Sequence, residues 1–312
     1  MVEVSIVLKL EPSCSYRFII FRFSFCFQIY LLALYAVICN CTGSELRSED
    51  SSVYSWVIII LVLVVVGLLA LLIVEIVIIY KIVSFGGVPC RSIWLGQLLL
   101  LAICLSYLTL IFFVFQPNPL VCRGMRFSVG ICYIFIQSIL LVKILIVLSP
   151  KTQAGFLKLG HQWLILILLW TVQVIINIQW LILAPSGVIS VHDGAVVCLP
   201  THTYSLFNDF LYSFIYIFIV GLILFAVTIR TYCCNRKLNG KPNSEAKWVL
   251  ITSFVTTATW LAWIIVGALL PAASMAALAL GLWVTATATL LIMFVPKLHK
   301  LATLKDGGRL IQ

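Results

Sequence analysis

Few side chains inside the long apolar runs of this sequence could do chemistry. Three ionisable residues fall there: Glu75, Lys143 and Asp209. Glu75 and Asp209 lie near the ends of their runs, where a side chain can reach water. Lys143 lies deeper, and a buried ammonium group needs a partner. The nearest plausible acid is Glu245, although spacing alone equally allows Lys143 and Glu245 to reach the interface independently.

The sequence lacks the residue patterns of catalytic sites, metal sites, transporters and channels. The sequence shows no nucleophile, base and orienting triad and no phosphate-binding loop, so we expect no enzyme. Its eleven Cys are scattered, without a CxxC pair or a His/Cys cluster, so neither a metal nor another cofactor is predicted. A transporter usually shows internal repeats, and a channel needs a charged ring or a filter loop. Neither feature is visible.

The composition places the chain in a membrane. Of 312 residues, 63% are hydrophobic and 10% charged, whereas soluble domains have roughly 45–50% and about 25%. Mean hydropathy is +1.19. These values exclude a soluble enzyme, a disordered protein and a coiled coil. The net charge of +10 comes from basic residues between the apolar runs, so we expect lipid and no nucleic acid as a partner.

The elements that must position these residues are transmembrane helices. A bilayer core about 30 Å thick needs about 20 apolar residues in a helix. Seven runs qualify: 56–79, 93–115, 121–148, 162–183, 207–229, 246–269 and 274–295. The connections are too short to hold a soluble domain. The sequence therefore predicts an all-α membrane protein, a bundle of seven transmembrane helices.

Lys and Arg in the short loops predict the orientation, since they favour the cytoplasmic side. Placing the 81–91 loop inside puts most basic residues inside, and the N-terminus then lies outside and the C-terminus inside. The loop between the fifth and sixth runs forms a basic inner surface that could face a G protein. Its basic residues are Arg230, Arg236, Lys237 and Lys241. The alternative is the general positive-inside bias of membrane proteins.

We expect four segments. Residues 1–39 form a signal peptide or an extra hydrophobic segment, 40–55 a short extracellular N-terminus, 56–296 the transmembrane domain and 297–312 a short cytoplasmic tail. Asn40 begins a glycosylation sequon, Asn40-Cys41-Thr42, on the predicted outer side.

Two further pairs are candidate functional residues. Cys122 and Cys198 both lie at predicted outer ends, where the oxidising environment permits a disulfide, although two free thiols remain the alternative. Trp260 and Trp283 are large rings on adjacent late helices. With Trp263 they could line an apolar cavity in the outer half, although plain helix packing is an alternative, and the favoured one for Trp263.

Several motifs together resemble one family. The segment Asn243-Ser244-Glu245-Ala246-Lys247, followed by Thr259-Trp260-Leu261-Ala262-Trp263, is similar to the N-E-A-K and I-W-L-A-F motifs of class C G protein-coupled receptors. Met293-Phe294-Val295-Pro296-Lys297 resembles their M-F-V-P-K ending. Two further segments are similar to the family's third and fourth spans. They are Pro119–Cys122 leading to Lys143, and Val172-Gln173 with Trp180. The resemblance covers about residues 56–301 and is closest to the metabotropic glutamate receptors.

The resemblance implies roles for individual residues. Cys122 and Cys198 match the disulfide between the third helix and the second outer loop. Lys143 and Glu245 match the cytoplasmic lock that favours the resting state. Trp260 matches a tryptophan of the allosteric pocket, and Pro296 and Lys297 match the seventh-helix motif. The implied location is the plasma membrane.

The sequence also departs from the family. Only about sixteen residues separate the predicted signal peptide from the first run, whereas class C receptors usually carry a large ligand-binding domain. Residues 144–147 differ from the glutamate-receptor pattern, which leaves the G protein class open. Two functions follow as expectations. One is a receptor that transmits an extracellular or intramembrane signal to heterotrimeric G proteins. The alternative is a truncated, non-signalling subunit that dimerises with a full-length receptor, and a homodimer or heterodimer is expected in either case.

Overall fold

The computed structural model describes residues 51–84, 90–115, 118–148, 159–183, 186–190, 196–200, 206–239, 244–270 and 274–307. The predicted segment 1–39, most of 40–55 with Asn40, and Lys241 lie outside the described residues.

Seven helices form the bundle in the described part of the chain, each long and apolar enough to cross a membrane. They are α2 (Ser51–Ser84), α3 (Cys90–Ile111), α4 (Pro119–Leu148), α5 (Leu159–Leu183), α6 (Leu206–Asn239), α7 (Ser244–Leu269) and α8 (Ser274–Gly307). The predicted bundle of seven helices is confirmed. Helices suit these sequences because in lipid every backbone polar group must be satisfied within the chain.

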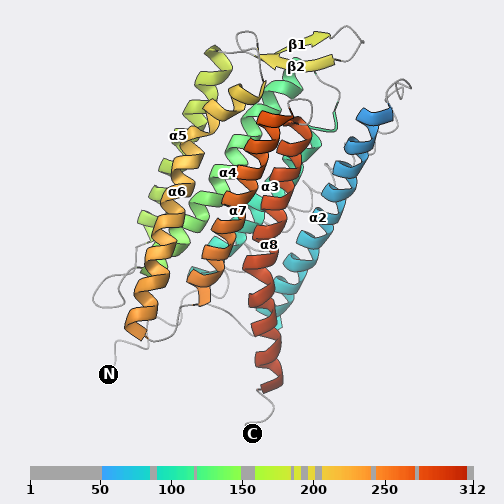
Figure 1. Ribbon diagram of the computed structural model, residues 1–312. Helices are drawn as coiled ribbons and strands as arrows, with labels where there is room; N and C mark the ends of the chain where they lie inside the picture. The colour runs from blue at the N-terminus through green and yellow to red at the C-terminus, as the bar shows by residue number, and fades with distance from the viewer. Residues whose placement is uncertain are drawn as a thin grey trace.

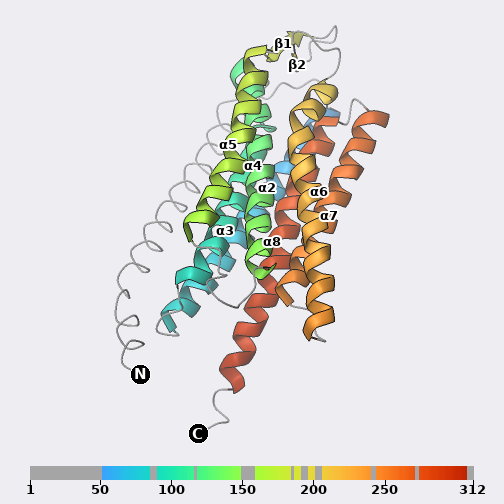
Figure 2. The same ribbon diagram turned by 90° about the vertical axis from the view of Figure 1, so that its left-hand side faces the viewer.

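One feature of the fold was not predicted, a short antiparallel hairpin. Strand β1 (Ser186–Ser190) pairs with β2 (Val196–Pro200). The hairpin lies at one end of the bundle, close to the start of α4 (Figure 1). We call this the hairpin end. At the opposite end, α8 continues past the other helices (Figures 1 and 2).

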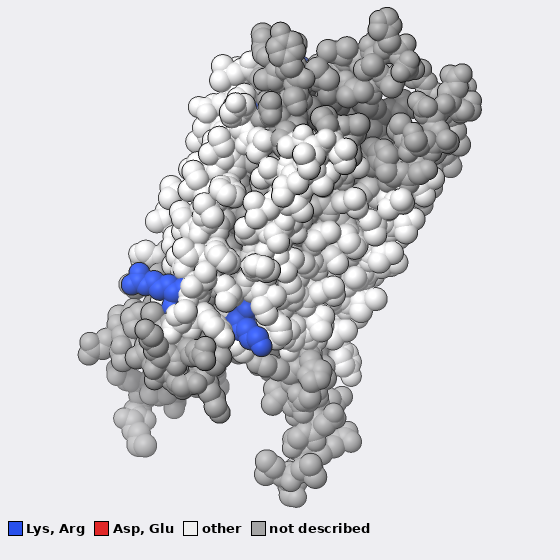
Figure 3. Space-filling model, viewed as in Figure 1, with Lys and Arg blue, Asp and Glu red and all other residues white. Residues whose placement is uncertain are grey.

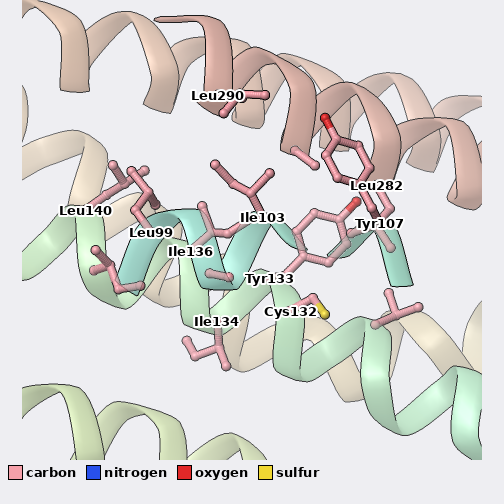
Figure 4. Packing of buried hydrophobic residues seen from close by; sticks show 14 of the residues in the cluster. Leu99, Ile103, Tyr107, Cys132, Tyr133, Ile134, Ile136, Leu140, Leu282 and Leu290 are labelled. Atoms are coloured by element: carbon pink, nitrogen blue, oxygen red, sulfur yellow. The ribbon is translucent and has the colours of Figure 1, made fainter. Parts of the chain in front are cut away.

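Helix α4 lies at the centre of the bundle. It contacts α3, α5, α6 and α7, and 67% of its most apolar window is buried, against 22% for α2 and 17% for α5. The close-up in Figure 4 shows residues of α3, α4 and α8 packed together, among them Ile103, Tyr107, Ile136 and Leu282. A functional side chain on α4 can therefore contact residues of several other helices.

Candidate functional site

The hairpin end is organised around the start of α4. The Asn118 side chain accepts a hydrogen bond from the backbone N–H of Val121 at 2.8 Å, an N-cap, and Pro119 takes the first helical position, which it suits. This turn places Cys122, which is 1% exposed and disulfide-bonded. Strand β1 contacts α4, and β2 carries Cys198 opposite Val188. The side chain of Cys198 lies outside the described residues, so the pairing of these two cysteines stays a prediction.

A ladder of three side chains crosses α4, α5 and α6 near this end. The guanidinium carbon of Arg126 lies 5.3 Å from the ring centroid of Trp180. On α6, the Tyr212 ring is stacked against Trp180, with centroids 6.1 Å apart. Arg126 is 4% exposed. From the sequence, Trp180 was noted only as part of a motif, whereas the structure joins it to Arg126 by a cation–π contact.

Deeper in the bundle, four aromatic rings from three helices pack together. Tyr133 lies on α4, Phe214 on α6, and Trp260 and Trp263 on α7. The centroid of Trp260 is 4.8 Å from Tyr133, 5.2 Å from Phe214 and 5.7 Å from Trp263, all edge-to-face. This geometry is favourable for aromatic pairs. We call these four residues the ring cluster.

Trp260 faces the interior of the bundle, as a pocket residue must. It is 6% exposed, and its indole N–H is buried without a hydrogen-bond acceptor among the described residues. A buried donor of this kind costs free energy until it finds an acceptor. Trp263 is equally buried and packs beside it.

Trp283 lies elsewhere. Its indole N–H donates a 2.9 Å hydrogen bond to the backbone carbonyl of Leu63 on α2. From the sequence, Trp260 and Trp283 were expected to line one cavity. The structure instead puts Trp260 in the ring cluster and uses Trp283 to join α8 to α2. Spacing along the chain could not show whether Trp283 points from α8 toward α7 or toward α2.

Three charged side chains from α4, α7 and α8 meet toward the opposite end. The Nζ atom of Lys297 lies 3.2 Å from Oε1 of Glu245, with the two side chains 41% and 44% exposed. Lys143 is only 9% exposed and lies within electrostatic reach of both. We call Lys143, Glu245 and Lys297 the charge cluster. Within this cluster the direct ion pair joins Glu245 to Lys297, which was noted from the sequence only for its motif with Pro296.

The remaining basic candidates are only partly described. Arg230 is exposed on α6, while the side chains of Arg236 and Lys237 lie outside the described residues. Pro296 sits inside α8, one residue before Lys297. In Figure 3, the Lys and Arg side chains seen most clearly lie near the end away from the hairpin, below a broad uncharged band.

Two amides on α5 form a site that the sequence analysis missed. Gln173 and Asn177 are 0% and 4% exposed and hydrogen-bond each other at 2.8 Å. Gln173 was noted only as part of a motif. The available signal was the spacing of four residues, which places two amides on one face of an otherwise apolar helix.

Within the described residues, no group of three or more His, Cys, Asp or Glu is placed to hold a metal ion.

Comparison with known proteins agrees with this architecture. The family described as "7 transmembrane sweet-taste receptor of 3 GCPR" matches residues 50–297, which cover the seven spans of the described residues apart from Leu298, the last residue of the seventh. No curated protein matches the chain significantly. The matched region contains the ring cluster, the charge cluster and Cys122. The chain therefore belongs to the seven-transmembrane family of class C G protein-coupled receptors, and it is a multi-pass receptor of the plasma membrane, not an enzyme.

Proposed function

We propose that this receptor carries a signal across the membrane by rearranging α7 and α8 relative to α4, and that it passes the signal to a heterotrimeric G protein. The charge cluster is the observation that carries this proposal, because it joins these three helices through charged side chains. Separating the helices would break its contacts, which is what a two-state element requires.

We infer that the hairpin end is extracellular. Cys122 is disulfide-bonded there, and disulfides persist in oxidising compartments. Helix α2 starts at the hairpin end and α8 ends at the opposite end (Figure 1), so the N-terminal side of the bundle is outside and the C-terminal side inside. Arg230, Lys247 and Lys297 then belong to the cytoplasmic half, in agreement with the positive-inside rule.

The cluster sets two cations against one carboxylate. An exposed ion pair such as Glu245–Lys297 contributes about 0–1 kcal/mol. Lys143 is different, because a buried ammonium group without a nearby anion is costly. Glu245 is therefore the residue on which the arrangement of all three helices depends. Its removal leaves two lysines that repel each other.

The cytoplasmic ends of α6 and α7 offer a surface for the G protein. Arg230 and Lys247 are both exposed there, and the connecting residues Arg236, Lys237 and Lys241 add positive charge in the sequence. A surface of one sign steers a partner of the opposite sign toward it. We propose that an acidic region of the G protein docks here.

The ring cluster is the proposed site of an intramembrane ligand. Trp260 supplies a buried N–H donor among aromatic rings, and pockets between helices are mostly apolar with a few polar groups. A ligand for this region is therefore apolar, uncharged and equipped with one hydrogen-bond acceptor.

A G protein activation assay tests the proposal. Cells expressing the full chain, Glu245→Gln or Arg123→Gln are compared with untransfected cells over a panel of Gα subunits. Arg123 is an exposed basic residue at the hairpin end of α4 and serves as the control. Increased basal activation by Glu245→Gln at equal surface expression, with Arg123→Gln unchanged, supports a signalling receptor. Silence of every variant, in cells where a related receptor signals, overturns G protein coupling by this chain alone. Signalling that then appears only on co-expression with a full-length class C receptor would assign it to the subunit alternative.

A further inference from the structure

Helix α5 packs against the bundle in an unusual way. Only four of its residues are buried, and three of them are amides: Gln162, Leu166, Gln173 and Asn177. Most of its large apolar side chains face outward, for example Leu164 at 64% and Ile182 at 73% exposure. Lipid tails are as apolar as leucine, so apolar side chains give little drive for a helix to leave lipid and join its neighbours. The amides therefore carry an unusually large share of the contact.

Two of these amides connect three helices. Gln173 Nε2 donates to Asn177 Oδ1 at 2.8 Å and to the backbone carbonyl of Ser213 on α6 at 3.3 Å. Asn177 Nδ2 donates to the backbone carbonyl of Phe127 on α4 at 3.0 Å. These two bonds to α4 and α6 can form together only when α5 has one particular rotation about its axis and one particular position along it.

Gly130 on α4 makes room for this arrangement. A Cβ atom on Gly130 would lie 3.0 Å from Asn177 Nδ2 and 3.1 Å from Gln173 Nε2. Both separations are tighter than ordinary van der Waals contact. The absence of a side chain therefore lets the amides approach the α4 backbone.

We propose that Gln173 and Asn177, seated on Gly130, form an amide clamp that fixes the rotation and depth of α5 against α4 and α6. The ladder of Arg126, Trp180 and Tyr212 crosses the same three helices and reinforces the unit toward the hairpin end. The clamp makes α4, α5 and α6 one body, against which α7 and α8 move. Polar groups buried among apolar side chains can specify a single register between packed helices, because other registers leave them without hydrogen bonds.

The first test replaces each amide by leucine, which is similar in size but cannot hydrogen-bond. Gln179 is the matched control, because it is an exposed amide on the same helix. In nanodiscs, Gln173→Leu and Asn177→Leu each lower the midpoint of thermal unfolding by about 2–4 °C, and Gln179→Leu does not. The double variant loses less than the sum of the singles, because the two amides share one bond. Equal midpoints for Gln173→Leu, Asn177→Leu and Gln179→Leu would overturn the clamp.

A second test uses the glycine and does not require the leucine variants to fold. Gly130→Ala lowers the unfolding midpoint, whereas Gly96→Ala does not, since a Cβ at Gly96 meets nothing within 4 Å. Truncating both amides to alanine removes the atoms that the new methyl group would meet. In that background Gly130→Ala adds no further loss. A loss that persists there would contradict the proposed seating.

A third measurement separates positioning from stability alone. Fluorophores at Ile182 on α5 and Ile215 on α6, both exposed, report the distance between these helices in the folded receptor below its unfolding temperature. Gln173→Leu broadens or shifts this distance distribution, and Gln179→Leu leaves it unchanged. An unchanged distribution in Gln173→Leu would show that the amides add stability without positioning α5. This test does not involve a G protein, so its failure would leave the proposed signalling function untouched.

Discussion

Oε1 of Glu245, in the first turn of α7, lies 3.2 Å from Nζ of Lys297 in α8. The carboxylate is also favourably placed at a helix N-terminus, where the helix dipole is positive. Lys143 on α4 approaches the same pair from the interior of the bundle. Glu245 thus has one half-exposed lysine and one buried lysine within reach, on two different helices.

Two charge exchanges show which lysine holds the resting state. We predict that Glu245→Gln raises basal G protein activation by about 5- to 150-fold, which corresponds to a coupling of about 1–3 kcal/mol. If Lys143 is the restraining partner, the exchange Lys143→Glu with Glu245→Lys partly restores the low basal level. The exchange Lys297→Glu with Glu245→Lys does so less, because an exposed pair contributes little. Basal activation at matched surface expression is the measurement.

Two other outcomes of these charge exchanges would contradict the prediction. Better restoration by the Lys297 exchange would assign the restraint to α7 and α8 alone. Equal activity in wild type, the single variants and both exchanges would remove the charge cluster from the mechanism.

We predict that the partner of Cys122 is Cys198. Cys122→Ala and Cys198→Ala then lower surface expression equally, and the double variant adds little to either. A disulfide typically contributes about 2–4 kcal/mol to stability. Cys233, a free and exposed cysteine, provides the control, and Cys233→Ala leaves expression unchanged. Peptide mapping of the non-reduced protein identifies the linked peptides directly, and a Cys122 peptide linked to any other cysteine contradicts the pairing.

The seven helices were predictable from sequence because lipid imposes a length and a composition on each span. The ends of the helices were less predictable. Helices α2, α6 and α8 extend to Ser84, Asn239 and Gly307, past the predicted runs that end at 79, 229 and 295. The hairpin of β1 and β2 was missed, since it lies in a connection between spans, where apolar runs give no signal.

Side-chain directions were less predictable. Burial of Lys143 and Trp260 was expected and is observed. The direction of Trp283 and the contact of Glu245 with Lys297 depend on how the helices are rotated about their axes. Nearly uniform apolar spans, with residues such as Ile and Leu on every face, do not encode that rotation in a simple periodicity. The polar residues Gln173 and Asn177 do encode it, but only their partners on α4 and α6 reveal how.

Trp283 offers a test of how α8 is held to α2. Its N–H bonds to the Leu63 carbonyl at 2.9 Å. Trp283→Phe keeps a ring and removes this donor, and we expect it to cost about 0.6 kcal/mol, the average for a polar contact between membrane helices. The thermal unfolding midpoint in nanodiscs measures this loss. An unchanged midpoint in Trp283→Phe would contradict the assignment of this hydrogen bond to the contact between α8 and α2.

Gly67 and Tyr107 provide the sharpest packing test in the bundle. Tyr107 on α3 is fully buried and shares a 2.9 Å hydrogen bond with Thr287 on α8. Its ring also covers Gly67 on α2 so closely that a Cβ there would lie 2.5 Å from the ring carbon Cε1. Because a fully buried ring has little freedom to withdraw, Gly67→Ala should force α2 and α3 apart.

We expect Gly67→Ala to destabilise the receptor by about 1–3 kcal/mol, the usual cost of overpacking. Tyr107→Phe keeps the ring, so it should lose only the hydrogen bond and leave Gly67→Ala as harmful as before. Tyr107→Leu has its own cost but removes the ring, so adding Gly67→Ala to it should cost less than in the wild type. Thermal unfolding of the protein with Tyr, Phe or Leu at position 107, each with and without Gly67→Ala, measures this coupling. An equal cost of Gly67→Ala in the Tyr107→Leu and wild-type backgrounds would show that the ring of Tyr107 does not set the distance between α2 and α3.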